Sequence, residues 1–351
     1  MSDASTNFGL LVLAPAAVTA LAALVATRAA HRWGWIDGGR GAHKLGQPAW
    51  PLSGGPALFA GLVALWIGVE ALGRAHAPFV PGRGLAALVG SSTSFDVTLW
   101  PFGAVAMAFL VGCLDDGLED GLTPLLKLLG QAACGFVLAT PMLLAAPAEL
   151  ESYLATLALM ALAVVALNCV NTFDNADGAA LTIGVLGLAL SATPFAAALA
   201  AFAPFNLRRD GASPWRRKAI LGDSGSHVLG ALILITPAAW PVLLVPALDL
   251  ARLCVARARL GIAPWEGDRR HLAHRLARLG LSPLRVALVL AAISMPVAVG
   301  AAWGPTWTAA LGAAITAALF VGTLRLAPAA PEVVAAAPVA AVARSNGFGG
   351  P

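Results

Sequence analysis

Segments without a single Asp, Glu, Lys or Arg residue recur along this chain at membrane-spanning length, and they limit its fold more than any other feature. A helix needs about 20 apolar residues to cross a bilayer. Charged residues make up only 11% of the chain, against about 25% in soluble domains, so a soluble core could not bury these segments. They are Phe8–Thr27, Leu52–Val69, Val97–Leu114, Leu128–Ala148, Ser152–Phe173, Ala179–Leu207, Ser224–Leu248 and Val286–Leu324.

The predicted fold is an all-α, polytopic bundle of about nine to eleven transmembrane helices, some of them short. Gly304-Pro305 stops and restarts the last apolar segment and divides it into two spans. Residues 1–326 are expected to form a single transmembrane domain, because no soluble domain or repeat interrupts them. Residues 327–351 are rich in Ala, Pro and Val, a composition that predicts a disordered tail.

The basic residues predict the topology, because cytoplasmic loops of membrane proteins collect Lys and Arg. In this chain Lys and Arg gather in three connecting segments, residues 28–44, 208–218 and 252–278. Placing them in the cytoplasm puts the N-terminus on the opposite side, together with the segments 73–100 and 141–151, which hold few basic residues. The formal net charge of +4 is modest and does not imply nucleic-acid binding.

Polar residues gather at the ends of the apolar segments, where ionisable groups are costly and mark candidate functional sites. The pair Asp115-Asp116 ends the third segment and is followed by Lys127 and Gln131. Two adjacent carboxylates repel each other, which indicates either a bound cation or protonation of one of them. A solvated helix end is the alternative.

A further cluster follows the fifth segment. Asn168, Asn171 and Asp174 are spaced three residues apart, so a continuing helix places them on one face, and Asp177 comes three residues later. Such a stripe of amides and carboxylates suits a nucleoside or a phosphate-bound metal. The alternative is a helix end with an Asp-Gly turn.

The segment Gly222–Ser226 directly precedes another apolar run. Glycines let the backbone approach phosphates, a helix N-terminus attracts anions, and Asp223 could ligate Mg²⁺. A plain capping turn is the competing interpretation, because Asp and Ser are good N-cap residues.

Two more clusters are basic. His271 and His274 share a face if their segment is helical, and both could meet a pyrophosphate. Asp268 and Arg275 flank them. A membrane-surface helix that contacts anionic lipid is the alternative for this cluster. The second basic cluster lies near the N-terminus and consists of Asp37, Arg40, His43, Lys44 and Gly54-Gly55. Its paired glycines could equally loosen the start of a helix.

Together the clusters supply metal ligands, phosphate donors and a base, a combination that suits diphosphate chemistry. The order of these clusters and the residues in them resemble the polyprenyl-phosphate N-acetylhexosamine-1-phosphate transferase family, from about Asp37 to Leu281. Residues 40–55 resemble the family's Arg-Lys-x-His…Gly-Gly element, and Asp115-Asp116 match its acidic pair. Residues 168–178 match its Asn-x-x-Asn-x-x-Asp-Gly-x-Asp-Gly motif, and residues 222–226 its Gly-Asp-x-Gly-Ser motif.

The chain departs from the family pattern at two positions. Asn175 stands where glycine is usual, and Ala273 replaces a histidine of the Asp…His-x-His-His element, which implies weaker diphosphate contacts there. The His-Leu-x-His-Arg-Leu motif that begins at His271 resembles the motif of the branch that transfers GlcNAc 1-phosphate more than that of the phospho-MurNAc-pentapeptide translocases.

The resemblance implies a reaction in which a lipid phosphate attacks the β-phosphorus of a UDP-sugar and releases UMP. It implies Asp223 and Asp116 as metal ligands. Asp115 is the residue implied to deprotonate or position the lipid phosphate, and the roles of Asp115 and Asp116 are open to exchange. The substrate-binding residues that it implies are His43, Lys44, Asn168, Asn171, Asp174, Asp177, His271, His274 and Arg275.

The same resemblance implies Mg²⁺ as the cofactor, with Mn²⁺ as a substitute, and undecaprenyl phosphate as the lipid. It implies a multi-pass protein of the bacterial cytoplasmic membrane with its active site facing the cytoplasm, and it leaves a homodimer open. Two rival functions stay open. One is phospho-MurNAc-pentapeptide transfer, and the other is a non-catalytic protein that binds or transports lipids or nucleotide sugars.

The lengths of two apolar segments bear on this choice. If all clusters share one membrane face, Ala179–Leu207 and Ser224–Asp249 must each cross an even number of times, yet both are shorter than the about 40 residues of two full crossings. Either they are shortened hairpins, broken near Thr193-Pro194 and Pro237, or each is a single span. The five basic residues of Arg208–Lys218 favour the hairpins.

Overall fold

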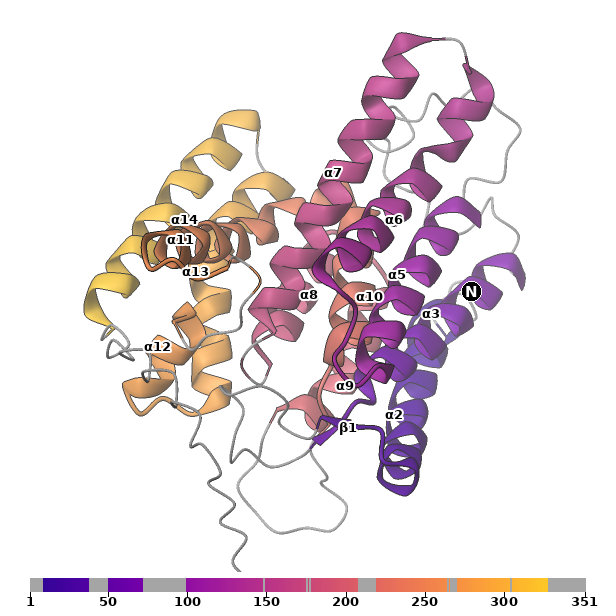
Figure 1. Cartoon of the computed structure of the whole chain (residues 1–351), viewed down its shortest axis with the longest axis horizontal. Helices are drawn as coiled ribbons and strands as arrows, with labels where there is room; N and C mark the ends of the chain where they lie inside the picture. Colours follow the sequence, from indigo (N-terminus) through magenta and orange to yellow (C-terminus); the bar gives the residue numbers. More distant parts are fainter. Residues whose placement is uncertain are drawn as a thin grey trace, which may run out of the picture.

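The structure is a computed structural model that describes residues 9–37, 50–71, 99–147, 149–174, 176, 178–207, 219–263, 265, 270–303 and 305–327 (Figure 1). Eight helical segments within these residues are long and apolar enough to cross a membrane. The chain is thus a multi-pass helical membrane protein, as predicted. The described helices are η1 Gly9–Leu13, α2 Ala14–Trp33, α3 Gly54–Ala71, α5 Leu99–Gly117, α6 Pro124–Ala145, α7 Leu150–Phe173, α8 Ala179–Leu190, α9 Phe195–Asn206, α10 Gly222–Leu234, η4 Pro237–Leu243, α11 Leu244–Arg259, α12 Leu272–Arg278, α13 Pro283–Trp303 and α14 Thr306–Leu326.

The described residues thus form twelve α-helices, one more than the upper estimate from the sequence. The additional helix is α12, a seven-residue helix that no apolar run announces. Two short strands, β1 Ile36–Asp37 and β2 Trp50–Pro51, pair antiparallel at the end of the bundle where α2 finishes. The predicted tail beyond residue 327 lies outside the described residues and stays a prediction.

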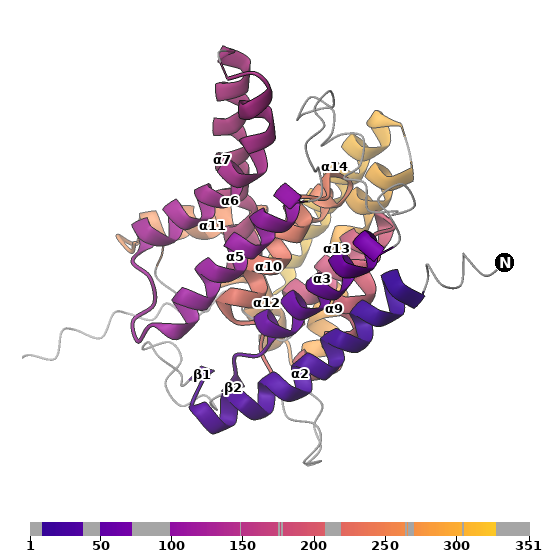
Figure 2. The ribbon, with the colours of Figure 1, turned by 90° about the vertical axis from the view of Figure 1, so that its right-hand side faces the viewer.

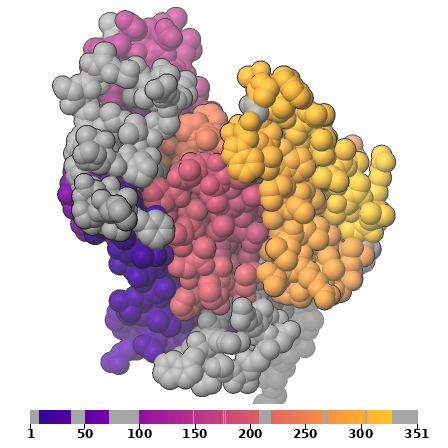
Figure 3. Space-filling view, turned by 180° about the vertical axis from the view of Figure 1, so that it is seen from behind, coloured from indigo at the N-terminus to yellow at the C-terminus, as the bar shows by residue number. Residues whose placement is uncertain are grey.

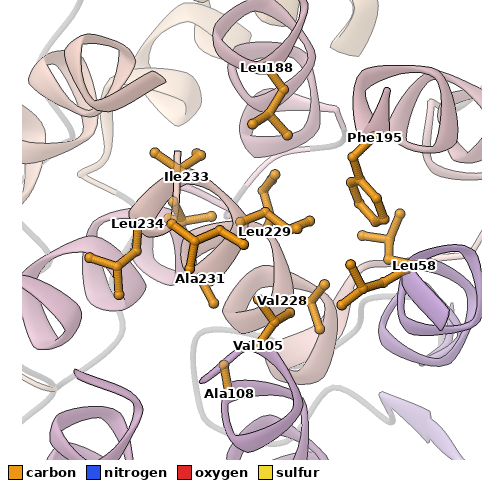
Figure 4. Close-up of a cluster of buried hydrophobic side chains, with 14 of the residues drawn as sticks. Leu58, Val105, Ala108, Leu188, Phe195, Val228, Leu229, Ala231, Ile233 and Leu234 are labelled. Carbon is orange, nitrogen blue, oxygen red and sulfur yellow. The ribbon is translucent and has the colours of Figure 1, made fainter. Parts of the chain in front are cut away.

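Helix α10 lies at the centre of the bundle. It is apolar on nearly every side, which is the pattern of a helix buried all round, and each of its residues from Ser224 to Leu234 is buried. It packs against α3, α5, α7 and α8. Figure 4 shows Val228 and Leu229 of α10 among Leu58, Val105 and Leu188 of its neighbours.

Three glycines let neighbouring helices reach the N-terminus of α10. A Cβ atom on Gly54 of α3 would lie 2.5 Å from the Cα atom of Leu221, and a Cβ atom on Gly112 of α5 would lie 2.5 Å from the carbonyl oxygen of Asp223. A Cβ atom on Gly55 would overlap the side chain of Ser224. The paired glycines therefore permit helix contact at this site, beyond any loosening of a helix start.

Both apolar segments break where the sequence predicted, but the second is not a short hairpin, because it continues into the helical segment Pro237–Arg259, which is long enough to cross a membrane. Helices α8 and α9 have 12 residues each and are joined by a turn at Thr193-Pro194, and α10 ends before Pro237. A 12-residue helix is about 18 Å long, well short of the about 30 Å of a bilayer core. The hairpin α8–α9 therefore dips into the bundle and returns to the same end.

Neighbouring helices flank this hairpin. Figure 3 shows the segment of residues 179–206, in rose, between α2 in indigo and the α13–α14 hairpin in orange and yellow. Its turn is internally hydrogen-bonded, since the backbone N–H of Thr193 donates to the carbonyl oxygen of Leu188 at 3.0 Å. A break in a helix at membrane depth is tolerated where protein surrounds it and satisfies its polar groups.

Exposed tryptophans mark both ends of the bundle. Trp33 ends α2 beside the strands, and Trp265 lies between α11 and α12, whereas Trp303 and Trp307 lie at the far end, where α13 meets α14. Tryptophan is enriched at both membrane–water interfaces. Figures 1 and 2 show α12 and the strands at one end of the molecule and the joined tips of α6 and α7 at the other.

Candidate active site

The acidic pair at the end of α5 points in two directions, because successive residues on a helix are about 100° apart. Asp116 faces the start of α10. Its Oδ1 atom accepts the backbone N–H of Asp223 at 2.9 Å, and its Oδ2 atom accepts the backbone N–H of Ser224 at 2.9 Å and the Ser224 hydroxyl at 2.6 Å. Asp116 thus satisfies the free N–H groups at the N-terminus of the central helix.

Asp115 faces the start of α6 instead. Its Oδ1 atom accepts the backbone N–H of Leu122 at 2.8 Å, and its Oδ2 atom lies 3.1 Å from the Nζ atom of Lys127. The same ammonium group also contacts Oδ2 of Asp223 on α10. Residues from three helices therefore place two carboxylates around one cation, and each of the three side chains stays partly exposed.

The carboxylates of this site are candidate ligands for Mg²⁺. Within the described ranges, no group of three or more His, Cys, Asp or Glu side chains is placed to hold a metal by itself. Mg²⁺ does not require such a cage, because it binds through one or two carboxylates, water and substrate phosphates. One oxygen of Asp115 and one of Asp223 already converge on the ammonium of Lys127. Asp115 and Asp223 are thus candidates for holding a divalent cation, and Asp116 fixes the backbone of Asp223.

The amide stripe on α7 joins the same site. The Nδ2 atom of Asn171 donates to the Ser226 hydroxyl at 3.1 Å, and that hydroxyl donates to the carbonyl oxygen of Asp223 at 3.1 Å. Asn168 lies one turn deeper and donates to Oε1 of Gln131 at 2.5 Å. Asp174 follows the last residue of α7, and its backbone N–H bonds back to Val170 at 3.0 Å. Three of the predicted clusters are therefore in direct contact.

The histidine cluster is positioned by Asp249, a buried carboxylate of α11 that is only 1% exposed. It accepts from Nδ1 of His271 at 3.1 Å, from Arg252 at 2.7 Å and from the backbone N–H of Leu272 at 3.2 Å. Arg252 also donates to the carbonyl oxygen of Arg270 at 2.7 Å. Asp249 thus caps the N-terminus of α12 and orients the ring of His271.

The buried face of α12 joins this cluster to the end of α7. Leu272 and Ala273 pack in one hydrophobic cluster with Phe173 of α7 and Ala179 of α8. Ala273 is fully buried, so the position where the family has another histidine is a packing position in this chain. The rings of His271 and His274 lie 6.2 Å apart between centroids.

Arg275 is held at the end of α14. Its Nη2 atom donates to the carbonyl oxygens of Leu324 at 2.5 Å and Ala327 at 2.6 Å. Burial and the neighbouring Arg252 and Arg278 lower the pKa of this guanidinium, which nevertheless stays protonated in proteins. Arg275, which the sequence predicts to bind the diphosphate, therefore also tethers α12 to the last described helix.

Two residues of this arrangement were not among the sequence-derived candidates. Asp249 follows the apolar run that contains α10, and His227 lies within it. Their signal was available, because an ionisable residue within a membrane segment is a functional candidate by default. His43, Lys44, Asp177 and Asp268 lie outside the described residues, and their predicted roles stay predictions.

Comparisons with known proteins show similarity to one family of membrane transferases. The profile of the family described as Glycosyl transferase family 4 matches residues 98–239, the range that contains Asp115, Asn171 and Asp223. A decaprenyl-phosphate N-acetylglucosaminephosphotransferase of Mycolicibacterium smegmatis is 28% identical over 349 residues, which cover 82% of this chain and 80% of the relative. The protein of the same name from Mycobacterium tuberculosis H37Rv is 29% identical over 331 residues, 76% of each chain.

A third relative matches a shorter part. An undecaprenyl-phosphate alpha-N-acetylglucosaminyl 1-phosphate transferase of Escherichia coli K12 is 28% identical over 152 residues, which cover 36% of this chain and 41% of the relative. The names of all three relatives describe the transfer of an N-acetylglucosamine phosphate group to a polyprenyl phosphate.

Proposed function

We propose that the chain is a member of glycosyl transferase family 4, whose profile matches residues 98–239, and that it transfers N-acetylglucosamine 1-phosphate from a UDP-sugar to a polyprenyl phosphate. The products are UMP and a lipid-linked diphosphate sugar. The lipid acceptor is supported by the names of the relatives and by the membrane-spanning helices. The UDP-sugar donor is proposed from the resemblance of the polar motifs.

One observation carries the proposal. Lys127 lies between Asp115 and Asp223 at the ends of three helices, in a partly exposed position. Phosphoryl transfer depends mainly on positioning and on charge stabilisation, and it needs a mixture of cations and carboxylates around the phosphates. A site with an ammonium group between two carboxylates, backed by amides, supplies that mixture.

The reaction forms a bond between a lipid phosphate oxygen and the β-phosphorus, and it breaks the bond from that phosphorus to the bridging oxygen. The electron pair stays on UMP. A phosphate monoester loses its second proton with a pKa of about 6, so at neutral pH the lipid phosphate needs orientation more than deprotonation. We assign that orientation to Asp115 and Lys127, and Lys127 also offsets negative charge during transfer.

Asp223 and Asp115 would hold Mg²⁺ or Mn²⁺, and Asp116 contributes by fixing the N-terminus of α10. In this assignment Asp115 takes the metal-ligand role that the sequence predicted for Asp116. A bound divalent cation would neutralise the diphosphate and the charge that develops on the leaving group.

The remaining residues are assigned by position. Asn171, which bonds to Ser226, and Asp174, which follows the end of α7, are proposed to hold the nucleotide, with Asn168 behind them. His271, His274 and Arg275 are proposed for the diphosphate. The basic segments that flank this end of the bundle favour a cytoplasmic active site in the bacterial cytoplasmic membrane.

The test is UMP release by the purified protein in detergent with UDP-GlcNAc, undecaprenyl phosphate and Mg²⁺. We expect release that needs the lipid and stops with EDTA. Asp115→Asn and Asp223→Asn should each lose about 100-fold or more of the rate, as expected when charge stabilisation is removed from a transfer site. Glu151→Gln is the matched control, because Glu151 is exposed at the far end of α7. Full activity in both Asn variants would refute the assignment.

UDP-MurNAc-pentapeptide in parallel tests the rival substrate. Release from that donor alone would move the protein to the cell-wall reaction. Nucleotide binding without release from either donor would support the non-catalytic alternative.

A further inference from the structure

A second polar layer lies one helical turn beneath the candidate active site. Gln131 follows Lys127 by four residues on α6, and His227 follows Asp223 by four residues on α10, so each pair lies on one helix face. Gln131 and His227 are both fully buried. Asn168 of α7 completes the layer at the depth of Gln131.

The backbone carbonyl oxygens at the two ends of this layer determine which group donates in each of its hydrogen bonds. The carbonyl oxygen of Val164 can only accept, so Asn168 donates to it from Nδ2 at 2.8 Å. The same Nδ2 atom also donates to Oε1 of Gln131 at 2.5 Å. Gln131 therefore presents its Nε2 donor to the Nε2 atom of His227, 3.0 Å away. His227 must accept at Nε2 and donate from Nδ1 to the carbonyl oxygen of Asp223 at 2.7 Å. This assignment makes His227 neutral, with its proton on Nδ1.

The layer thus connects the three helices that carry the site. The bond from Gln131 to His227 links α6 to α10, and the bond from Asn168 to Gln131 links α7 to α6. The Nδ1 bond of His227 and the bond from Asn168 to Val164 are local, because each runs to a residue one turn back on its own helix. A rotation of α6 or α10 by a fraction of a turn would break this chain, and the same rotation would separate Lys127 from Asp223.

We propose that His227 is a positioning residue of the proposed transfer reaction, which holds Lys127 and Asp223 in register through its bond to Gln131. The inference rests on the proposed function. It also accounts for an otherwise costly feature, because a buried imidazole in an apolar helix is unfavourable unless both nitrogens are paired. An apolar residue at position 227 would pack in this environment without any partner.

Two substitutions separate the two bonds of His227. In His227→Gln the side-chain oxygen can reach the position of Nε2 and keep the bond to Gln131. In His227→Asn the side-chain nitrogen can reach the position of Nδ1 and keep only the bond to the Asp223 carbonyl. We expect His227→Gln to retain most of kcat, whereas His227→Asn and His227→Leu lose about tenfold or more, a loss typical of residues that orient the groups of a site. KM for UDP-GlcNAc should change less than kcat.

A double substitution distinguishes positioning from packing. His227→Leu alone leaves the Nε2 group of Gln131 buried without its partner, which lowers thermal stability. His227→Leu with Gln131→Leu removes both polar groups, so it should regain part of the lost Tm and yet remain as slow as the single variant. Gln131→Asn, whose amide is too short to reach His227, tests the same bond from α6 if a position-227 variant does not fold.

The outcomes are distinct. Recovery of kcat together with Tm in the double variant, or equal kcat in the Gln and Asn variants, would overturn the inference and leave His227 as a packing residue. Failure of the proposed function would be seen in the unmodified protein, which would then release no UMP from any UDP-sugar, and this would overturn the inference as well. Slow turnover with restored Tm would support it.

Discussion

The two polar regions of the molecule are built differently. The carboxylate site is formed by the ends of α5, α6, α7 and α10, and its side chains bond directly from helix to helix. The histidine region is formed by the seven-residue α12, which one buried carboxylate, Asp249, holds at its N-terminus. The first region is fixed by the packing of the whole bundle, whereas the second depends on a few local contacts.

This difference suits the two tasks that we assign to them. Reacting groups must be held in a defined geometry, because a small displacement reduces the rate strongly. Groups that bind a large, charged donor must admit it and then contact it, and elements that open and close are drawn from the less stable parts of a fold. We therefore expect substitutions in the first region to reduce catalysis directly. Substitutions in the second region should act through the placement of α12.

The largest effect is expected for Lys127→Met. It removes the ammonium between Asp115 and Asp223 and keeps a side chain of similar length, so the two carboxylates repel each other and the charge stabilisation is lost. UMP release should fall by about 100-fold to 1,000-fold. Arg325→Gln, which removes an exposed cation at the end of α14, is the control and should be neutral. A rate within a factor of two of the unmodified protein would contradict the role of Lys127.

An intermediate effect is expected for Asp249→Asn. The amide oxygen can still cap α12, but the charged contacts to His271 and Arg252 are lost. Activity should fall by about 10-fold to 100-fold, as for other orienting residues, and hydrogen exchange should accelerate in α12. Exchange in α10 should stay unchanged, because its contacts are untouched. Equal acceleration in α10 would show that the two regions unfold together and would break the comparison.

The smallest effect is expected for Arg275→Gln. The variant loses charge-assisted bonds to the carbonyl oxygens of Leu324 and Ala327, each of which contributes about 1.5–3 kcal/mol in favourable cases. We expect faster hydrogen exchange at the end of α14 and a loss of activity smaller than that of Asp249→Asn. Arg278→Gln, on the same helix, is the control. A larger loss of activity than in Asp249→Asn would show that Arg275 contacts the substrate directly.

Much of the bundle was predictable because the membrane imposes simple rules. Charge-free segments of spanning length identified the long helices, and Pro194 and Pro237 identified the breaks within two further apolar segments. The spacing of Asn168 and Asn171 placed both on one face of α7, and that face meets α6 and α10. Periodicity and breakers are local properties, so the sequence contains them directly.

The division of labour within the site was not predictable in this way. Asp115 and Asp116 are adjacent and chemically identical, and only the arrangement of α6 and α10 determines that one meets Lys127 and the other caps a helix. The contact of Lys127 with Asp223 joins residues far apart in the sequence. Without an indication of which helices are neighbours, the sequence identifies the participants but not their partners.

The destination of the β-phosphorus tests the central claim most directly. Purified protein would be given UDP-GlcNAc labelled with ³²P at the β-position, undecaprenyl phosphate and Mg²⁺, and the label would be followed into the organic phase. We predict that the label enters the lipid, that unlabelled UMP is released in equal amount, and that Asp223→Asn prevents both. Label that remains in water-soluble UDP while sugar enters the lipid would reveal sugar transfer without phosphate and would contradict the proposed reaction.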